Sequence, residues 1–126
     1  MQYIAGAVAA VHEWRGITIR ELTPPGDGLP GSLVEIDVPA GVTHPVARST
    51  MCATFYYCDR GELEFDSGGR QVRVSRGDLV VVGQGEWYSY RNDSAQPVRL
   101  LSVNVPAYDA SATEIQEDGS PAGGHD

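Results

Sequence analysis

The sequence contains no lysine, because all nine of its basic residues are arginine. A chain without lysine cannot form a Schiff base with a carbonyl substrate and cannot use a lysine to hold a phosphate. Its 17 Asp and Glu residues give a net charge of −8, which opposes binding to nucleic-acid backbones and anionic lipid surfaces. We therefore expect no nucleic-acid partner and no membrane partner, and a small molecule as the substrate.

Cysteine is almost as scarce, and no long apolar run is present. Cys52 and Cys58 are separated by five residues, a spacing typical neither of CxxC redox motifs nor of common zinc sites. The longest weakly apolar stretch, residues 4–11, is far shorter than the ~20 residues that cross a bilayer and lacks the basic flank of a signal peptide. The sequence thus predicts a cytoplasmic protein with reduced thiols.

Long helical patterns are also missing, and short alternating segments take their place. Apolar and polar residues alternate in segments that read as strands, at residues 17–20, 33–38, 54–65, 72–74, 79–82, 87–91 and 98–105. Turn clusters separate them at the close spacing of an antiparallel sandwich or barrel. We predict one all-β domain, with an N-terminal arm over 1–13, a folded body over 14–109 and an acidic, disordered tail over 110–126 that starts with a turn of helix.

Two segments of the folded body follow a recognisable pattern. The first has a Pro-Ala-Gly turn at 39–41, a polar loop, aromatic residues at 55–57 and Gly-Glu-Leu-Glu-Phe at 61–65. The second begins with Gly-Asp-Leu at 77–79 and continues through Tyr88 to Asn92. In order and spacing, these segments resemble the two motifs of the cupin superfamily. The resemblance implies a single cupin domain, folded as a jelly-roll β-barrel, also called a double-stranded β-helix.

The metal-binding positions of this pattern hold unusual residues. Metal-binding cupins carry His-x-His and Glu in the first motif and His in the second, a set that suits a divalent first-row metal. At those positions this sequence has Ala47, Ser49, Thr54 and Tyr88, none of which is one of those ligands. The resemblance therefore implies a cupin that uses no metal and no other cofactor. A metal site built from His44, Cys58 and a tyrosine is an open alternative.

Short matches point to a narrower group within the superfamily. They are residues 14–19, His44 just after the Pro-Ala-Gly turn, the pair Tyr56-Tyr57, and residues 105–109. They resemble the metal-independent dehydratases and epimerases of antibiotic nucleoside and sugar pathways, which work by His/Tyr acid–base chemistry. The resemblance implies an enzyme of secondary metabolism.

Strand alternation indicates which side chains point into the barrel, starting from an inward Thr54. The expected inward set is Thr54, Tyr56, Cys58, Tyr88 and Tyr90, and the expected outward set is Phe55, Tyr57 and Trp87. Inward tyrosines are candidates for a site. The outward aromatic residues are candidates for the contact of a homodimer. Cys58 is expected to be a core residue, since no base lies beside it in the sequence.

His44 is the candidate general base, because an imidazole that titrates near neutral pH can remove a proton beside a carbonyl. Tyr56 is the candidate acid, since a phenol in an apolar cavity is a good hydrogen-bond donor. The plainer alternatives are a loop histidine that binds a backbone carbonyl and a tyrosine that only shapes a pocket. The candidate substrate-binding residues are Arg48, Tyr88, Tyr90, Thr54, Arg20 and Asn104.

These candidates predict a metal-independent lyase, specifically a dehydratase, or an isomerase of a small carbonyl-bearing metabolite. In this hypothesis His44 takes the proton beside the carbonyl, Arg48 or a tyrosine holds the enolate oxygen, and Tyr56 protonates a departing hydroxyl or a carbon. The alternative from another class is a non-catalytic cupin that binds a small molecule as a sensor or carrier. In that case the tyrosines only form a wall.

Overall fold

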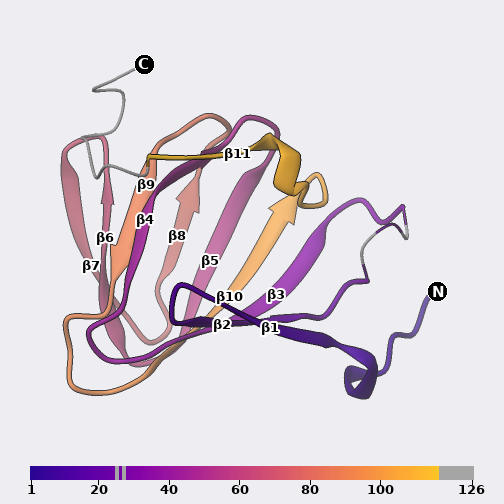
Figure 1. The fold of residues 1–126 in the computed structure, drawn as a ribbon, viewed down its shortest axis with the longest axis horizontal. Coiled ribbons are helices and arrows are strands. Elements are labelled where there is room, and N and C mark those ends of the chain that lie inside the picture. The colour runs from indigo at the N-terminus through magenta and orange to yellow at the C-terminus, as the bar shows by residue number, and fades with distance from the viewer. Residues whose placement is uncertain (25, 27, 117–126) are drawn as a thin grey trace.

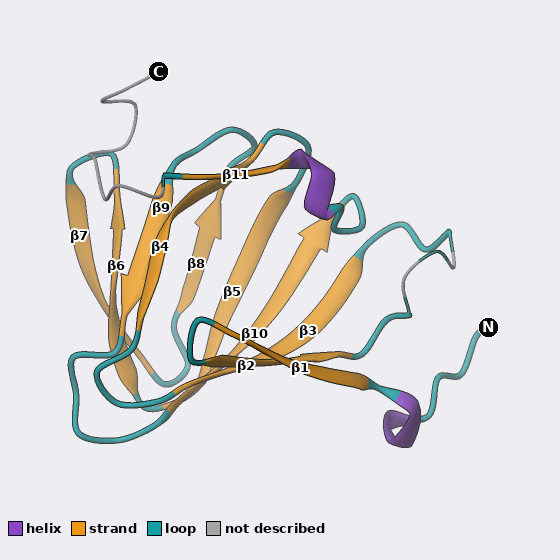
Figure 2. Ribbon diagram, in the orientation of Figure 1, coloured by secondary structure: helices purple, strands orange, loops and turns teal. Residues whose placement is uncertain are grey.

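The computed structural model describes residues 1–24, 26 and 28–116, and nearly all of its regular structure is β (Figure 1, Figure 2). The strands are β1 (Ala10–Trp14), β2 (Ile17–Glu21), β3 (Ser32–Val38), β4 (Thr43–Ser49), β5 (Ala53–Arg60), β6 (Glu62–Ser67), β7 (Arg70–Ser75), β8 (Leu79–Val82), β9 (Tyr88–Arg91), β10 (Val98–Val105) and β11 (Thr113–Ile115). Two short 3-10 helices are η1 (Gly6–Val8) and η2 (Ala110–Ala112). Within the described ranges, no helix has the length and apolar character needed to cross a membrane.

The strands form two antiparallel sheets that face each other (Figure 1). The six-stranded sheet has the order β1-β2-β3-β10-β5-β8, and the five-stranded sheet has the order β11-β4-β9-β6-β7. From β3 onward the chain passes repeatedly from one sheet to the other, and only β6 and β7 follow each other in the same sheet. This repeated crossing is the jelly-roll arrangement, so the predicted all-β jelly-roll fold is confirmed.

Apolar side chains from alternate strand positions fill the space between the sheets. Val38, Leu63, Val98 and Leu100 are completely buried there. Removing each such side chain from water stabilises the fold by about 1.5–3 kcal/mol. The core therefore holds the two sheets together along most of their length.

The alternation of β5 has the predicted phase. Thr54, Tyr56 and Cys58 are buried, whereas Phe55 and Tyr57 are exposed. Because successive side chains of a strand point to opposite faces, the inward residues share the space between the sheets. The prediction for this strand is confirmed, and Tyr56 reaches the interior.

The turn between β5 and β6 requires glycine. Gly61 has a φ of 84°, and a Cβ at this position would lie 2.8 Å from the Pro97 carbonyl oxygen and 2.9 Å from Val98 Cγ2. Only glycine tolerates both the left-handed backbone and this close approach. The glycine of the first motif thus allows the chain to pass directly from one sheet to the other.

The ends of the folded body differ from the predicted boundaries. β1 begins at Ala10, inside the predicted arm, and pairs with β2. Residues 110–115, inside the predicted disordered tail, form η2 and β11, and β11 pairs with β4. The sequences of these two short strands show no clear alternation of apolar and polar residues. Only their pairing with β2 and β4 identifies them as strands. The rest of the predicted tail, residues 117–126, lies outside the described residues.

Strand β4 has no counterpart among the predicted strands. Its sequence Thr-His-Pro-Val-Ala-Arg-Ser lacks regular alternation, and proline normally weakens a strand. The pairing of β4 with β9 shifts register between His44 and Ala47, so Pro45 lies at a bulge where a missing N–H is tolerated. The same irregularity turns both His44 and Ala47 to the interior.

Candidate active site

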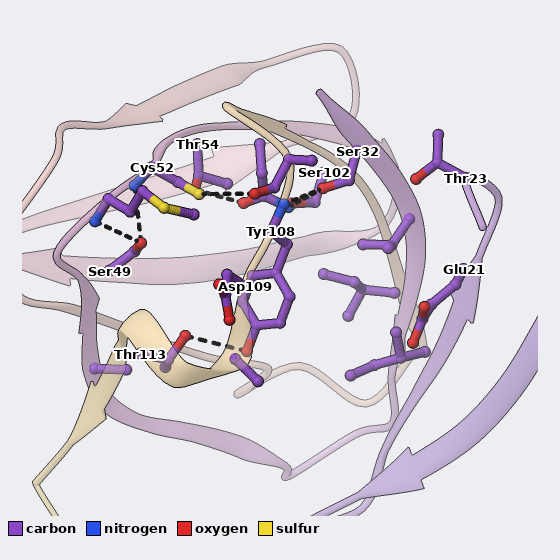
Figure 3. Close-up of a pocket in the computed structure, with 18 of the residues that line it drawn as sticks. Glu21, Thr23, Ser32, Ser49, Cys52, Thr54, Ser102, Tyr108, Asp109 and Thr113 are labelled. Carbon is purple, nitrogen blue, oxygen red and sulfur yellow. Dashed lines mark hydrogen bonds between the residues drawn. The ribbon is translucent and has the colours of Figure 1, made fainter. Parts of the chain in front are cut away.

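One cavity between the two sheets brings most of the predicted site residues together. Its volume is about 890 Å³, which suits a small metabolite. Of the predicted residues, the lining includes His44, Arg48, Thr54, Tyr56, Tyr88, Tyr90 and Asn104. Figure 3 shows part of the lining, with Thr54, Ser102 and Ser32 gathered on one side and Glu21 on another.

His44 enters the cavity from the bulge in β4, and its neighbour fixes its tautomer. The His44 Nδ1 atom lies 2.6 Å from the Pro45 carbonyl oxygen. Because a carbonyl oxygen can only accept a hydrogen bond, Nδ1 carries the proton of the neutral ring. His44 therefore presents Nε2 as its basic atom.

Aromatic rings surround His44 and keep it uncharged. Its ring centroid lies 4.7 Å from that of Tyr90, 5.4 Å from that of Tyr88 and 5.3 Å from that of Trp14. Burial among these rings lowers the pKa of His44 from its ordinary 6.5 to about 4, because the charged form loses its hydration. The hydrogen bond to Pro45 opposes this shift only in part. His44 is thus an unprotonated base throughout the neutral pH range.

Two tyrosines join the sheets beside His44. Tyr56 Oη, from β5, donates a hydrogen bond to Tyr88 Oη, from β9, over 2.7 Å. Burial raises the pKa of Tyr88 to about 12 and raises the pKa of Tyr56 well above its ordinary value. Both phenols are neutral at physiological pH, and Tyr88 accepts from Tyr56 while its own proton is available for donation. Tyr90 completes the wall, and burial raises its pKa as well.

The facing wall, on the six-stranded sheet, carries a network of neutral polar groups. Thr54 Oγ1 donates to Asn104 Oδ1 over 2.8 Å, and Asn104 Nδ2 donates to Ser32 Oγ over 3.2 Å. Ser102 is 3% exposed and also lines the cavity. The sequence patterns did not single out Ser32 or Ser102. Once Asn104 is known to face the cavity, both can be assigned to the same face. Ser32 pairs with Asn104 across the strands, and Ser102 lies two residues before Asn104 on β10.

The two cysteines occupy different environments. Cys52 lines the cavity, but it is buried and its thiol donates to the Pro106 carbonyl oxygen over 3.2 Å. Cys58 is a core residue outside the cavity lining, and burial raises the pKa of its thiol. The alternative metal site of His44, Cys58 and a tyrosine is therefore not assembled, since Cys58 and His44 do not share a cavity.

The positions that hold the metal in other cupins converge here without suitable ligands. Ala47, Ser49, Thr54 and Tyr88 all line the cavity, as the resemblance implies. A methyl group, two alcohols and a phenol of raised pKa make a poor donor set for a divalent first-row metal. Across residues 1–24, 26 and 28–116, no three His, Cys, Asp or Glu side chains are grouped to hold a metal ion.

The two predicted binding arginines both take part in ion pairs, and only Arg20 lies outside the cavity lining. Arg48 lines the cavity, yet its guanidinium lies 4.5 Å from the Trp87 ring centroid and 2.7 Å from the Glu114 carboxylate. Arg20 does not line the cavity and pairs with Glu35 at 3.1 Å. Both charges are thus used in ion pairs along the sheets. Of the two arginines, only Arg48 lines the cavity, and it stays a predicted binding residue.

Carboxylates stand on the more exposed part of the lining. Glu13 and Asp109 are exposed, Glu21 is half-buried, and all three line the cavity. Hydrogen bonds from the Ser111 hydroxyl and N–H lower the pKa of Asp109, which is therefore ionised. An anionic molecule meets negative charge on entering, so the cavity favours a neutral or cationic one. These residues carried no sequence signal of their own.

Known proteins share this architecture. No curated protein sequence matches the chain significantly. Among solved structures, the Streptomyces nucleoside dehydratase Pac13 is 17% identical, with a TM-score of 0.76 over 96% of this chain and 98% of that chain. Ectoine synthase from P. lautus is 22% identical, with a TM-score of 0.71 over 88% of this chain and 86% of that chain. At such identities, the likeness concerns the fold alone.

A predicted oxalate decarboxylase from Thermotoga maritima is a further example, 16% identical, with a TM-score of 0.73 over 83% of this chain and 99% of that chain. The sequence match is more specific than these likenesses. The cupin domain family matches residues 34–104, which is more than half of the chain and spans both motifs. The chain therefore belongs to the cupin family.

Proposed function

We propose that the chain is a lyase or isomerase of a small carbonyl-bearing metabolite, and specifically a dehydratase of a β-hydroxy carbonyl compound. One observation carries the proposal: an unprotonated His44 stacks beside the hydrogen-bonded pair of Tyr56 and Tyr88 in one buried cavity. A base and a proton donor held together suit proton removal from carbon and proton delivery to oxygen.

The reaction proceeds by elimination. His44 Nε2 takes the proton from the carbon beside the carbonyl, and the electrons of that C–H bond form a C=C bond. The C–O bond to the β-hydroxyl breaks, and the Tyr88 proton converts the departing hydroxyl to water. Tyr56, 2.7 Å away, replaces the proton on Tyr88, and the proton on His44 returns to the tyrosine pair through solvent. In an isomerisation, the proton returns to carbon instead.

The surroundings of His44 support this role. Its hydrogen bond to the Pro45 carbonyl becomes charge-assisted when the ring gains a proton, and it strengthens at that moment. Tyr90 packs on the ring and holds its orientation. On the facing wall, Thr54, Asn104 and Ser102 offer neutral hydrogen-bonding groups for the polar substituents of a substrate.

Relatives of the same fold support an enzyme. Pac13 is a nucleoside dehydratase, and its structures with uridine include a His-to-Gln variant and two different Tyr-to-Phe variants. Ectoine synthase is a second enzyme of this fold. The poor metal donor set of the cavity favours metal-independent acid–base chemistry. We propose that the reaction belongs to secondary metabolism, as the narrower resemblance implies, and that it takes place in the cytoplasm, as the expected reduced thiols suggest.

Deuterium uptake tests the proton-removal step. Wild-type protein is incubated in D₂O with a panel of neutral β-hydroxy aldehydes and ketones derived from sugars and nucleosides, and NMR follows deuterium at the carbon beside the carbonyl and loss of the β-hydroxyl. We expect exchange or elimination on one member, and a loss of about 10²–10⁴-fold in His44→Gln, which removes the base.

The matched control is His12→Gln, since His12 also lines the cavity but is exposed and lies 3.6 Å from Glu21. This variant is expected to exchange at the wild-type rate. The proposal is wrong if His44→Gln exchanges the active compound at the wild-type rate. If no compound in the panel exchanges while some bind, the chain is a binding protein instead.

A further inference from the structure

Tyr108 lines the cavity, and the proton transfers proposed for His44 and the tyrosine pair do not use it. It lies between β10 and η2, on the segment that connects the six-stranded sheet to the five-stranded sheet (Figure 1). In Figure 3, the Tyr108 ring lies between Thr113 and the wall that carries Ser32 and Ser102. Because 52% of Tyr108 is exposed, its side chain is accessible to a molecule in the cavity.

Hydrogen bonds fix Tyr108 at both of its ends. Its backbone N–H donates to Ser32 Oγ over 3.0 Å, which ties it to the polar wall of the six-stranded sheet. Its hydroxyl oxygen accepts from Thr113 Oγ1 over 3.1 Å, and Thr113 belongs to β11, at the edge of the five-stranded sheet. The side chain therefore runs from one sheet to the other in a defined orientation. A group that is held in place before a substrate binds loses little freedom in the reaction.

The hydrogen bond from Thr113 leaves the proton of the Tyr108 hydroxyl available. A phenol oxygen can accept one hydrogen bond while it donates its own proton to another group. Thr113 is the donor in this bond, so Tyr108 is oriented as a donor towards a molecule in the cavity.

Tyr108 also lies close to the tyrosine pair. Thr113, its hydroxyl partner, is on β11 and Tyr88 is on β9, and these two strands flank β4 in the five-stranded sheet. Burial is the main cause of the raised pKa values of Tyr56 and Tyr88, and electrostatic interaction with Tyr108 is a smaller cause for both. A single small molecule can therefore contact Tyr108 and the tyrosine pair together.

The proposed reaction needs a hydrogen-bond donor at the carbonyl oxygen, besides a base and an acid. As His44 takes the proton from the neighbouring carbon, this oxygen gains negative charge, and a donor already aimed at it lowers the barrier. Arg48, which the sequence suggests for this task, pairs with Glu114 at 2.7 Å. On the facing wall, the Thr54 hydroxyl donates to Asn104. These groups already have partners, which favours a donor from another part of the lining.

We propose that the Tyr108 hydroxyl donates a hydrogen bond to the carbonyl oxygen of the substrate and stabilises the negative charge that develops there. The inference rests on the proposed function, because it assigns one more catalytic residue to the same reaction. The carbonyl oxygen then lies at Tyr108, the carbon that loses its proton at His44, and the β-hydroxyl at Tyr88. Tyr108 itself neither gains nor loses a proton, and the charge leaves the carbonyl oxygen when the C–O bond to the β-hydroxyl breaks.

Deuterium exchange and elimination, measured at saturating concentration of the compound that wild-type protein converts, test this role. Tyr108→Phe keeps the ring and removes the hydroxyl. We expect it to slow both processes by the same factor, because charge develops on the carbonyl oxygen in both. The factor is about 10–10²-fold, below the 10²–10³-fold typical of an oxyanion donor, since Tyr108 is half exposed. Tyr88→Phe, in contrast, is expected to slow elimination and to leave exchange near the wild-type rate.

Two control variants separate a direct contact from a structural role. Tyr57→Phe removes a hydroxyl from the outer face of β5 and is expected to match wild type in both measurements. Thr113→Val removes the partner of the Tyr108 hydroxyl but keeps the phenol, so it is expected to slow exchange less than Tyr108→Phe does. Equal slowing by Thr113→Val and Tyr108→Phe would show that the hydroxyl only holds this segment in place, and would overturn the inference.

The remaining outcomes distinguish this inference from the proposed function. If folded Tyr108→Phe exchanges at the wild-type rate while His44→Gln does not, the role of Tyr108 is wrong and the proposed function stands. Slower elimination with wild-type exchange overturns the role as well. If His44→Gln exchanges at the wild-type rate, the proposed function fails and this inference fails with it. Tyr108→Leu, which also lacks the hydroxyl, replaces Tyr108→Phe if circular dichroism shows that the latter is unfolded.

Discussion

The two walls of the cavity use buried polar groups in opposite ways. On the six-stranded sheet, Thr54 and Asn104 satisfy each other with a hydrogen bond, and Ser32 extends the network. On the five-stranded sheet, His44 is buried as a neutral base whose Nδ1 is used by the Pro45 carbonyl oxygen. Neutral polar groups that satisfy each other stabilise a fold, whereas burial of a titratable base penalises its charged form.

This difference separates the groups that transfer protons from the groups that position the substrate. Both walls are polar and both are buried, so polarity alone does not identify the reactive one. The reactive wall has a titratable group with a shifted pKa beside a proton donor, His44 beside Tyr88. The facing wall has neutral groups that neither gain nor lose a proton near pH 7. We therefore expect substitutions on the two walls to affect different kinetic constants.

Among substitutions other than those of His44, the largest effect is expected from Tyr88→Phe, which removes the hydroxyl that donates to the departing group. We expect elimination on the active compound to slow by about 10²–10³-fold, as for loss of a donor to a developing charge. Tyr56→Phe only slows replacement of that proton and is expected to cost about tenfold. Single-turnover measurement of elimination and of deuterium exchange separates the two steps, because exchange depends on His44.

Tyr57→Phe is the matched control for both variants, since Tyr57 lies on the outer face of the same strand as Tyr56. Its elimination rate is expected to equal that of wild type. If Tyr88→Phe eliminates at the wild-type rate, the tyrosine pair is not the acid of the reaction. If Tyr56→Phe slows elimination more than Tyr88→Phe does, then Tyr56 gives its proton to the departing group and Tyr88 replaces it.

Acid is expected to destabilise the reactive wall specifically through His44. The pKa of His44 is about 4 in the folded chain and 6.5 in its ordinary state, so the unfolded chain takes up the proton first as the pH falls. The stability contributed by neutral His44 is complete above pH 6.5 and is lost as the pH falls towards 4. The loss amounts to roughly 3 kcal/mol, from 1.36 kcal/mol per pKa unit.

Urea unfolding at pH 7 and at pH 4.5 measures this loss. His44→Gln removes the titrating group, so its free energy of unfolding is expected to change less between the two pH values than that of wild type. His12→Gln is the histidine control, because the His12 side chain is 48% exposed. Equal changes in wild type and His44→Gln would show that His44 is not held neutral by the fold.

The sequence predicted the fold and the inward face of β5 because both depend on local patterns. Turn glycines such as Gly61 and the alternation of Thr54 and Tyr56 are readable along the chain. The roles of the arginines were not readable. Arg48 pairs with Glu114, 66 residues away, and that pairing exists only because β11 lies beside β4. Distant strand pairing thus decides which charges remain available to a site.

Strand β4 shows the same limit for secondary structure. Pro45 disrupts its pattern, and only the partner strand β9 defines it as a strand. The bulge at Pro45 nevertheless turns His44 inward and fixes its tautomer. The feature that hid the strand from sequence analysis is therefore the feature that makes the histidine a base.

The smallest effect is expected from Thr54→Val, on the wall that we interpret as positioning. The substitution removes the donor to Asn104 Oδ1 and is expected to lower the free energy of unfolding by about 1 kcal/mol. It is expected to raise KM severalfold and to leave kcat close to wild type, because neither Thr54 nor Asn104 takes up or gives a proton in the reaction. Thr18→Val is the matched control, since Thr18 lies on β2 outside the cavity lining. If kcat falls in Thr54→Val as far as in Tyr88→Phe, the division of the cavity into a reactive wall and a positioning wall is wrong, because both walls then contribute to the same transition state.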